Sequence, residues 1–239
     1  TTGGTNSAAS YVNSESSSSA ANTVINAGTL TTSGSDARGI RILSKNSNAT
    51  IENSGSVTTS GAGATGIYAR NESASKKSVV FLTNSETGRI SVSGSNANAI
   101  LIDGSASIAN AGMVCGGLVS GGACLASPST VGSTISLGNS NAQNRSRSVL
   151  LNNATGTIAA GGTAAAISTD AGGVDIYNYG AIISAGALAI DFADGAGLDS
   201  NSLTVLGGST MVGELAFNRL GTGETLIFCG FGSAFGNGV

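Results

Sequence analysis

Two stretches of the chain carry the same phrase: TVINAGTLTTSGSDARGIRIL, which begins at Thr23, and ATIENSGSVTTSGAGATGIYA, which begins at Ala49. Each has an apolar pair, an asparagine, a glycine soon after it, a turn rich in glycine and serine, and a second apolar run. Further copies begin at residues 79, 105, 149 and 174, and a looser one begins at 203. A phrase that recurs along a chain, with insertions in some copies, is typical of a solenoid.

The asparagine and the glycine of the phrase align from copy to copy. The glycines are separated by 27, 33, 24, 44 and 24 residues, which indicates a short base period with insertions. We expect the asparagines to stack at a corner of the fold and to form a hydrogen-bonded ladder. The aligned residues are Asn26, Asn53, Asn84, Asn110, Asn153 and Asn178, followed by Gly28, Gly55, Gly88, Gly112, Gly156 and Gly180.

The apolar runs alternate with a period of two, as in Ile40 with Ile42 and Ile100 with Ile102. That period is typical of strands, and the glycine, serine and asparagine between the runs favour turns. The chain has one proline, as expected where each strand inside a stack must donate its N–H groups. The sequence predicts an all-β protein, a single-stranded right-handed parallel β-helix of about seven to nine coils with loop excursions.

The repeats also divide the chain. We expect an N-terminal cap or tail over 1–22 and the β-helix over 23–206, with insertions near 71–78 and 114–148. Residues 207–239 are expected to form C-terminal coils or a cap. Terminal caps are expected because an open solenoid end exposes unpaired strand edges.

The composition excludes several classes of function. The chain has no histidine, which excludes a Ser-His-Asp triad, a Cys-His dyad and a His-ligated metal site. No apolar run is long enough for a transmembrane helix, so membrane insertion is not expected. Basic residues are too sparse, and stacking aromatic residues too few, for a nucleic-acid partner. We expect no metal site and no cofactor.

The three cysteines are Cys115, Cys124 and Cys229. The first two bracket the octapeptide GGLVSGGA, and this spacing fits a short loop closed by a disulfide in an oxidising compartment. A zinc site is not expected, since three thiols without histidine cannot complete four ligands. Cys229 is left over.

Positive charge gathers in the first part of the chain, where residues 1–147 hold nine of the ten Lys and Arg residues. Loops that leave a rigid scaffold are common sites of recognition, and the two insertions carry basic residues. The predicted binding residues are Lys76, Lys77, Arg145, Arg147 and Arg70. We expect them to meet an acidic receptor surface or a sulfated glycan. Three further residues would widen this surface if they face outward: Arg38, Arg41 and Tyr68.

Carboxylates are the remaining candidates for catalysis. Asp170 and Asp191 follow the second apolar run in adjacent coils, and paired carboxylates are the usual catalytic groups of glycoside hydrolysis. No Lys or Arg lies between residues 148 and 218 to accompany them. We therefore assign no catalytic residue and expect that the chain is not an enzyme.

The closing phrase GGSTMVGELAFNRLGTGETLIF, which begins at Gly207, joins the asparagine–glycine repeats in a resemblance to a known family. The chain resembles the passenger domains of Gram-negative autotransporters (type V secretion), in which a G-x-x-x-x-G-x-hydrophobic phrase precedes G-x-G-[DE]-T-L-x-F. Here these positions are Gly208, Gly213 and Leu215, then 221–228. The resemblance implies a parallel β-helix that crosses the periplasm and outer membrane to be secreted or displayed on the bacterial surface.

Together, the residues and the resemblance predict a virulence-type passenger that binds host cell surfaces through loops leaving the β-helix. It would act as an adhesin or as a soluble receptor ligand, with a host cell-surface protein receptor or a sulfated glycan as partner. Two alternatives stay open. One is a self-association module or structural spacer, and the other is a β-helix enzyme that acts on a polysaccharide.

Overall fold

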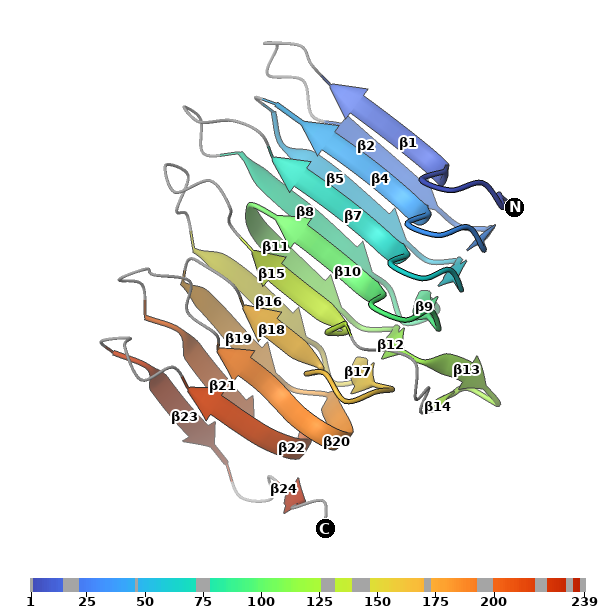
Figure 1. Ribbon diagram of the computed structural model, residues 1–239. Coiled ribbons are helices and arrows are strands. Elements are labelled where there is room, and N and C mark those ends of the chain that lie inside the picture. The colour runs from blue at the N-terminus through green and yellow to red at the C-terminus, as the bar shows by residue number, and fades with distance from the viewer. Residues whose placement is uncertain are drawn as a thin grey trace.

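The computed structural model describes residues 2–14, 22–45, 47–71, 78–125, 132–138, 147–169, 173–192, 200–217, 223–230 and 234–236. These residues form strands and turns and contain no helix, so none of them forms a membrane-spanning helix. The strands pair in parallel from one turn to the next and build a β-solenoid (Figure 1). The predicted all-β parallel β-helix is confirmed.

The solenoid has three faces, and the chain visits faces C, B and A in that order in each turn. Face A contains β1 (Ala8–Ser14), β4 (Arg38–Ser44), β7 (Thr65–Asn71), β10 (Asn98–Asp103), β15 (Ile135–Gly138) and β18 (Ile167–Thr169). Face B contains β3 (Thr29–Thr32), β6 (Ser56–Thr59), β9 (Arg89–Val92), β12 (Met113–Gly116), β17 (Thr157–Ala160) and β24 (Ala234–Gly236). Face C contains β2 (Asn22–Asn26), β5 (Ala49–Asn53), β8 (Val79–Asn84), β11 (Ser105–Asn110), β16 (Ser148–Asn152), β19 (Val174–Asn178), β21 (Ser202–Leu206) and β23 (Thr225–Cys229).

Two long strands, β20 (Ala181–Phe192) and β22 (Thr210–Phe217), pass from face B to face A without a break. The eight strands of face C, counted over the part of the chain that the structure describes, come from successive turns. Their number agrees with the seven to nine coils expected from the sequence. A separate antiparallel hairpin, β13 (Leu118–Ser120) and β14 (Ala123–Leu125), leaves the stack after β12.

The core consists of columns of aliphatic side chains, because in-register parallel strands place equivalent residues directly above one another. Burial of each isoleucine or leucine stabilises the fold by roughly 1.5–3 kcal/mol. On face A the column is Ile40, Ile67, Ile100, Ile135, Ile167 and Ile190, all fully buried. On face C it is Val24, Ile51, Leu82, Ile108, Leu150, Ile176 and Leu203.

The predicted asparagine ladder is present at the corner between faces C and B, with one correction. The side-chain amide of each of the first five asparagines donates to the Oδ1 of the asparagine one turn further along, at 2.7–2.8 Å, and that of Asn178 donates to the carbonyl of Thr210. The six members are Asn26, Asn53, Asn84, Asn110, Asn152 and Asn178. The sequence alignment placed Asn153 in this row, which is wrong by one residue. The adjacent pair Asn152-Asn153 follows the longest insertion, where the repeat leaves the register ambiguous.

At two rows of stacked glycines, the corners of the solenoid are packed too tightly to hold a side chain. A Cβ atom on Gly55 would lie 2.0 Å from the carbonyl oxygen of Gly28, and one on Gly94 would lie 1.8 Å from that of Gly61. Such contacts are far shorter than van der Waals distance. Gly55 and Gly94 are therefore required by backbone-to-backbone stacking between turns, whereas Gly28, in the first copy, has open space at its Cβ position.

The segments expected as caps or insertions contribute strands to the stack. Residues 1–22 contain β1, which pairs with β4, and residues 207–239 contain β22, β23 and β24. The long insertion near 114–148 is divided by β15, which lies between β10 and β18 on face A. The hairpin therefore leaves between faces B and A, whereas residues 139–147 connect face A to face C.

Candidate functional site

The five predicted binding residues do not form one cluster among the residues that the structure describes. Lys76, Lys77 and Arg145 lie outside the described residues. Arg70 is near the end of β7 and Arg147 immediately precedes β16, so both lie near the corner between faces A and C. They belong to different turns, and each has its own carboxylate partner.

The Arg147 guanidinium connects neighbouring turns. Its Nε donates to Asp175 Oδ2 at 2.9 Å, a second amino group contacts Asp175 Oδ1, and Nη1 donates to the carbonyl of Ser200 at 2.8 Å. The Ser202 hydroxyl also donates to Asp175. The hydrogen bond from Arg147 is the main reason that the pKa of Asp175 is lowered; the Ser202 bond adds to it, and partial burial opposes it. Arg147 therefore holds turns together.

Arg70 pairs with Asp103 on the next strand of face A. Its Nε lies 3.4 Å from Asp103 Oδ2, and the Arg70 side chain is 46% exposed. The two residues are register partners on β7 and β10. An exposed pair of this kind contributes little to stability, and it leaves much of the guanidinium facing solvent.

A row of outward side chains on face A alternates aromatic and basic groups. Tyr11, Arg41 and Tyr68 occupy the same register position on β1, β4 and β7. They point away from the core because Ile40 and Ile42, the residues on either side of Arg41, point into it. The Arg41 guanidinium lies 5.0 Å from the centroid of the Tyr11 ring, and that of Arg38 lies 4.7 Å from the Tyr68 ring.

These two arginines are held by rings instead of carboxylates. The Nε atoms of Arg38 and Arg41 are buried and have no hydrogen-bond acceptor among the described residues. Arg38 Nη1 donates to the backbone carbonyl of Asp36 at 3.3 Å. Neither guanidinium makes an ion pair with a carboxylate in the described ranges. Within the part of the chain that the structure describes, no carboxylate neutralises their positive charge.

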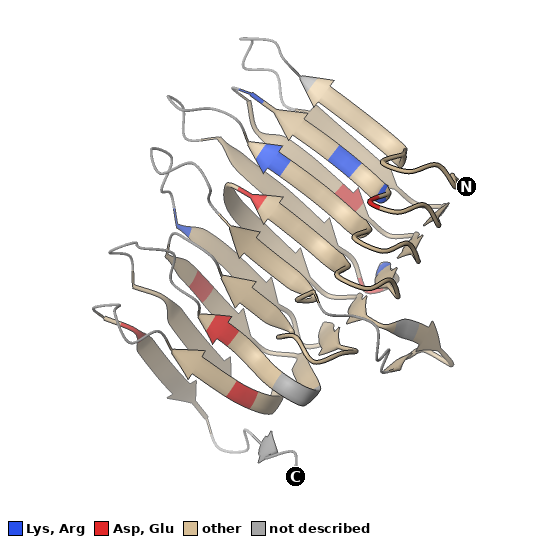
Figure 2. Cartoon of the chain, in the orientation of Figure 1, with Lys and Arg blue, Asp and Glu red and all other residues tan. Residues whose placement is uncertain are grey.

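We call Tyr11, Arg38, Arg41, Tyr68 and Arg70 the arginine–tyrosine surface. Figure 2 shows basic residues on the front strands of the N-terminal turns and acidic residues on the last turns, including β20 and β22. The charge asymmetry of the sequence is therefore an asymmetry along the solenoid axis. Arg38, Arg41 and Tyr68 face outward, which was the condition for them to widen the basic surface.

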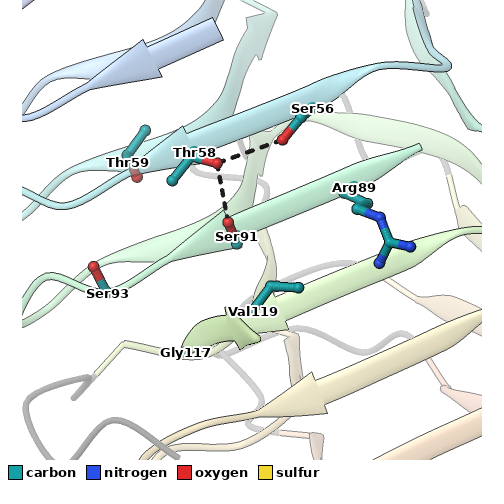
Figure 3. Close-up of a pocket in the computed structure, with 8 residues that line it drawn as sticks. All are labelled: Ser56, Thr58, Thr59, Arg89, Ser91, Ser93, Gly117 and Val119. Carbon is teal, nitrogen blue, oxygen red and sulfur yellow. Dashed lines mark hydrogen bonds between the residues drawn. The ribbon is translucent and has the colours of Figure 1, made fainter. Parts of the chain in front are cut away.

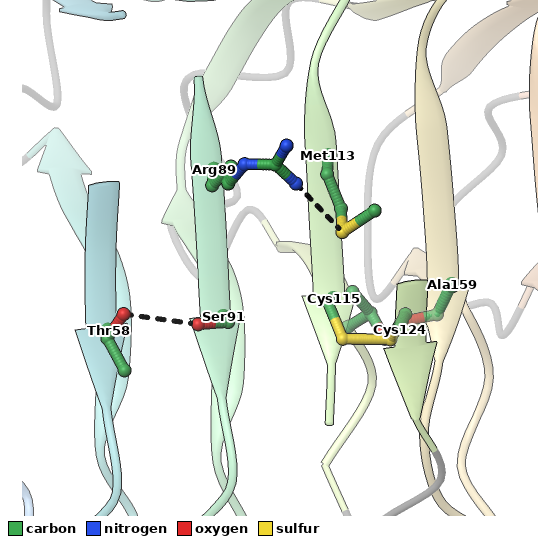
Figure 4. The surroundings of a disulfide bond; sticks show 8 residues. Thr58, Arg89, Ser91, Met113, Cys115, Cys124 and Ala159 are labelled. Atoms are coloured by element: carbon green, nitrogen blue, oxygen red, sulfur yellow. Dashed lines mark hydrogen bonds between the residues drawn. A yellow bond between two sulfur atoms is a disulfide. The ribbon is translucent and has the colours of Figure 1, made fainter. Parts of the chain in front are cut away.

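The predicted disulfide between Cys115 and Cys124 is confirmed and attaches the hairpin to face B. Cys115 occupies an outward position on β12, in register with Ser91 and Ala159, yet it is fully buried. Its burial results from the hairpin, whose Cys124 Sγ lies 3.7 Å from the carbonyl oxygen of Ala159 (Figure 4). Cys229 is a free, exposed thiol.

The attached hairpin forms one wall of a cavity of about 250 Å³ on face B (Figure 3). Its floor is a cluster of hydroxyl groups, in which Thr58 Oγ1 lies 3.3 Å from Ser91 Oγ and 3.5 Å from Ser56 Oγ. The hairpin side contributes Gly117 and Val119. Arg89 stands at the edge of this cavity, and its Nη1 lies 4.0 Å from the sulfur of Met113.

Of the two carboxylates considered for catalysis, Asp170 and Asp191, the structure describes only Asp191. Asp170 lies outside the described residues. Asp191 faces outward on β20, and its partners on the adjacent strands are Ser168 and Ala216. Within the described ranges no group of three or more acidic or cysteine side chains is placed to hold a metal ion.

Two features of the molecular surface escaped sequence reasoning. Tyr11 was missed because residues 1–22 lack the repeat phrase, although Tyr11 and Val12 are residue types favoured in strands. The cavity was missed because it depends on where the hairpin lies against face B, which the spacing of the cysteines does not specify.

Comparisons of the chain with protein-family models, with curated proteins and with solved structures find no match. The candidate site is therefore defined by its own geometry: an outward row of stacked arginines and tyrosines on a parallel stack of strands. The cavity beside the disulfide-bonded hairpin lies on face B and is separate from this site.

Proposed function

We propose that this chain is a binding protein, a secreted or surface-displayed bacterial passenger that contacts host cell surfaces as an adhesin or a soluble receptor ligand. One observation carries the proposal: Arg38 and Arg41 are held against tyrosine rings, face outward and have no carboxylate partner in the described ranges. Arg147 differs from them, since its charge is paired with Asp175. Ordered, unneutralised guanidinium groups are suited to binding an anionic partner.

The bacterial passenger assignment is supported by the sequence and agrees with the fold. The closing phrase from Gly207 and the asparagine–glycine repeats carry the resemblance to autotransporter passengers. A parallel β-solenoid is the fold which that resemblance implies. The disulfide suits an oxidising compartment such as the periplasm or the cell exterior.

The proposal is tested by binding of labelled protein to intact mammalian cells. We compare the wild type with an R38A/R41A variant and with R89A, a matched control that removes an exposed arginine from face B. We expect saturable binding that weakens at raised salt, is reduced at least tenfold in R38A/R41A and is unchanged in R89A. Absence of saturable binding, or equal binding by all three proteins, would refute the proposal.

A second comparison tests whether the basic loops contribute to binding alongside the arginine–tyrosine surface. A Lys76/Lys77/Arg145→Ala variant leaves the arginine–tyrosine surface intact. If the loops contribute as the sequence predicts, this loop variant binds more weakly than the wild type, as R38A/R41A does. If it binds as the wild type does, the loops are not part of the binding surface.

A further inference from the structure

We propose that the arginine–tyrosine surface binds an extended sulfated glycan, laid across β1, β4 and β7 along the solenoid axis. This inference rests on the proposed binding function and names the chemistry of its ligand. The surface supplies the two kinds of group that such a chain needs: planar cations for its sulfates and aromatic rings for its sugars.

The arginines are organised in advance for anions. Each guanidinium lies over a tyrosine ring, and its Nε is buried between neighbours. The donors left to meet a ligand are therefore on the terminal amino groups. Arg38 Nη1 already donates to the carbonyl of Asp36, and the remaining N–H groups of both arginines can bind sulfate or carboxylate. Because stacking already restricts these long side chains, little further conformational entropy is lost when a ligand binds.

The tyrosines retain surface for a sugar ring. Tyr11 is 51% exposed even with the Arg41 guanidinium over its ring. Aromatic side chains offer an apolar face and a polar hydroxyl, a combination that suits the C–H groups and hydroxyls of a sugar. Tyr11 and Tyr68 flank Arg41 at the same register position, so ring, cation and ring follow one another across three strands.

The surface repeats along one direction, which suits a polymer. Adjacent strands lie about 4.8 Å apart, so equivalent side chains succeed one another at a regular interval. A chain of charged sugars presents its sulfates at regular intervals too. The cavity beside the hairpin lies on face B, so this surface is an open row with no part in that cavity.

The charge of the surface remains positive after its neighbours are counted. Among the described residues, two acidic residues lie close by: Asp103, which pairs with Arg70, and Asp36, whose backbone carbonyl accepts from Arg38. Three arginines therefore stand beside two carboxylates. An acidic protein would also be attracted, because Arg and Tyr are enriched in protein interfaces too, but the cations and rings of this surface follow one another along one direction, as the sulfates of a polymer do. We therefore favour the glycan.

The test measures binding to immobilised heparin, with desulfated heparin and the unsulfated glycosaminoglycan hyaluronan as comparisons. We expect the wild type to bind heparin and to bind both comparison glycans at least tenfold more weakly. R38A/R41A should lose at least tenfold in affinity for heparin, with R89A unchanged. Thermal unfolding of each variant confirms that the fold is retained.

Variants that keep the positive charge distinguish a site built on stacked arginines from general electrostatic attraction to heparin. R38K/R41K keeps both charges but loses the planar groups, and Y11F keeps the ring. We expect R38K/R41K to resemble R38A/R41A, Y11F to bind almost as the wild type does, and Y11S to bind about threefold more weakly. Equal heparin affinity of R38K/R41K and the wild type would overturn the inference, as would equal binding to desulfated heparin.

The failure of this inference is distinguishable from failure of the proposed function. If the protein binds cells through Arg38 and Arg41 but does not bind heparin, the glycan inference is wrong and an acidic protein receptor is indicated. If it binds heparin, and removal of sulfated glycans from cells with heparinase abolishes cell binding, both are supported. If it binds neither heparin nor cells, both are refuted.

Discussion

At the scale of single residues, the asparagine ladder shows how one side chain connects two turns. Asn84 accepts a hydrogen bond from Asn53 and donates one to Asn110, each at 2.8 Å, and it is fully buried. Each amide uses both its donor and its acceptor on identical neighbours. Asparagine fits this row for two reasons. A shorter side chain cannot reach its neighbour in the next turn, and an acidic side chain would place like charges in a buried row.

Replacing Asn84 with alanine leaves the Asn53 amide without its acceptor and the Asn110 carbonyl oxygen without its donor, both in a buried row. Because a buried polar group without a partner costs about 1–3 kcal/mol, we expect N84A to lower the free energy of unfolding by about 3 kcal/mol. Urea denaturation followed by circular dichroism measures this. The matched control is N153A, next to the ladder but outside it, which should cost less than about 1 kcal/mol. Equal losses would contradict the ladder's role.

Asp175 links stability to pH. Its pKa is lowered in the folded protein, chiefly by the hydrogen bond from Arg147, so folding favours the carboxylate. This stabilisation is present above the ordinary pKa of the group, 3.8, and is lost as the pH falls through the lowered folded value. We expect D175N to be about 1 kcal/mol less stable than the wild type at pH 7, since the pair is partly exposed.

The same variant gives the pH test. Below pH 3.8 the difference in stability between the wild type and D175N should shrink, because the wild-type carboxyl becomes protonated as well. Thermal unfolding at several pH values between 7 and 2 measures it. If the difference in stability between the wild type and D175N stays constant over this pH range, the ion pair with Arg147 is not its cause.

At the scale of elements, the hairpin β13–β14 depends on one covalent bond. Three residues in each strand form a pair too small to be stable by itself. The disulfide joins it to the outer surface of β12 and thereby creates the cavity near Arg89.

We expect a C115S/C124S variant to release the hairpin while the stack remains folded. A disulfide that closes a loop of about this length contributes roughly 2–3 kcal/mol. Limited proteolysis should cleave the variant near Gly121 and Gly122, whose left-handed backbone marks the hairpin turn, much faster than the wild type. Circular dichroism should be nearly unchanged. Equal rates of cleavage would show that other contacts hold the hairpin in place.

Most strands could be predicted from the local sequence pattern, because each repeat of a solenoid forms one structural unit that contacts only its neighbours. Alternation in the runs around Ile40 and Ile100 specified strands, and the spacing of Cys115 and Cys124 specified their disulfide. The register after the longest insertion could not be predicted, because Asn152 and Asn153 are equivalent in sequence and only inter-turn pairing distinguishes them. The partners of Arg147 and Arg41 could not be predicted either, since both depend on how neighbouring turns align.

At the scale of the whole molecule, parallel in-register stacking converts a sequence repeat into surface rows. The row that holds Tyr11, Arg41 and Tyr68 continues through Leu101, Ser136 and Ser168 to Asp191. One row therefore changes along the axis from aromatic and basic, through the apolar Leu101 and two serines, to acidic. The binding function that we propose belongs to the first part of this row.

The central claim is that the stacked arginines of face A form the binding surface, and one measurement tests it most directly. It is the pair of cell-binding isotherms of R38A/R41A and R89A, recorded beside the wild type on the same mammalian cells. We predict that R38A/R41A binds at least tenfold more weakly while R89A matches the wild type. If R38A/R41A binds as tightly as the wild type, or R89A weakens binding as much as the double variant does, the surface that we propose is not the binding site.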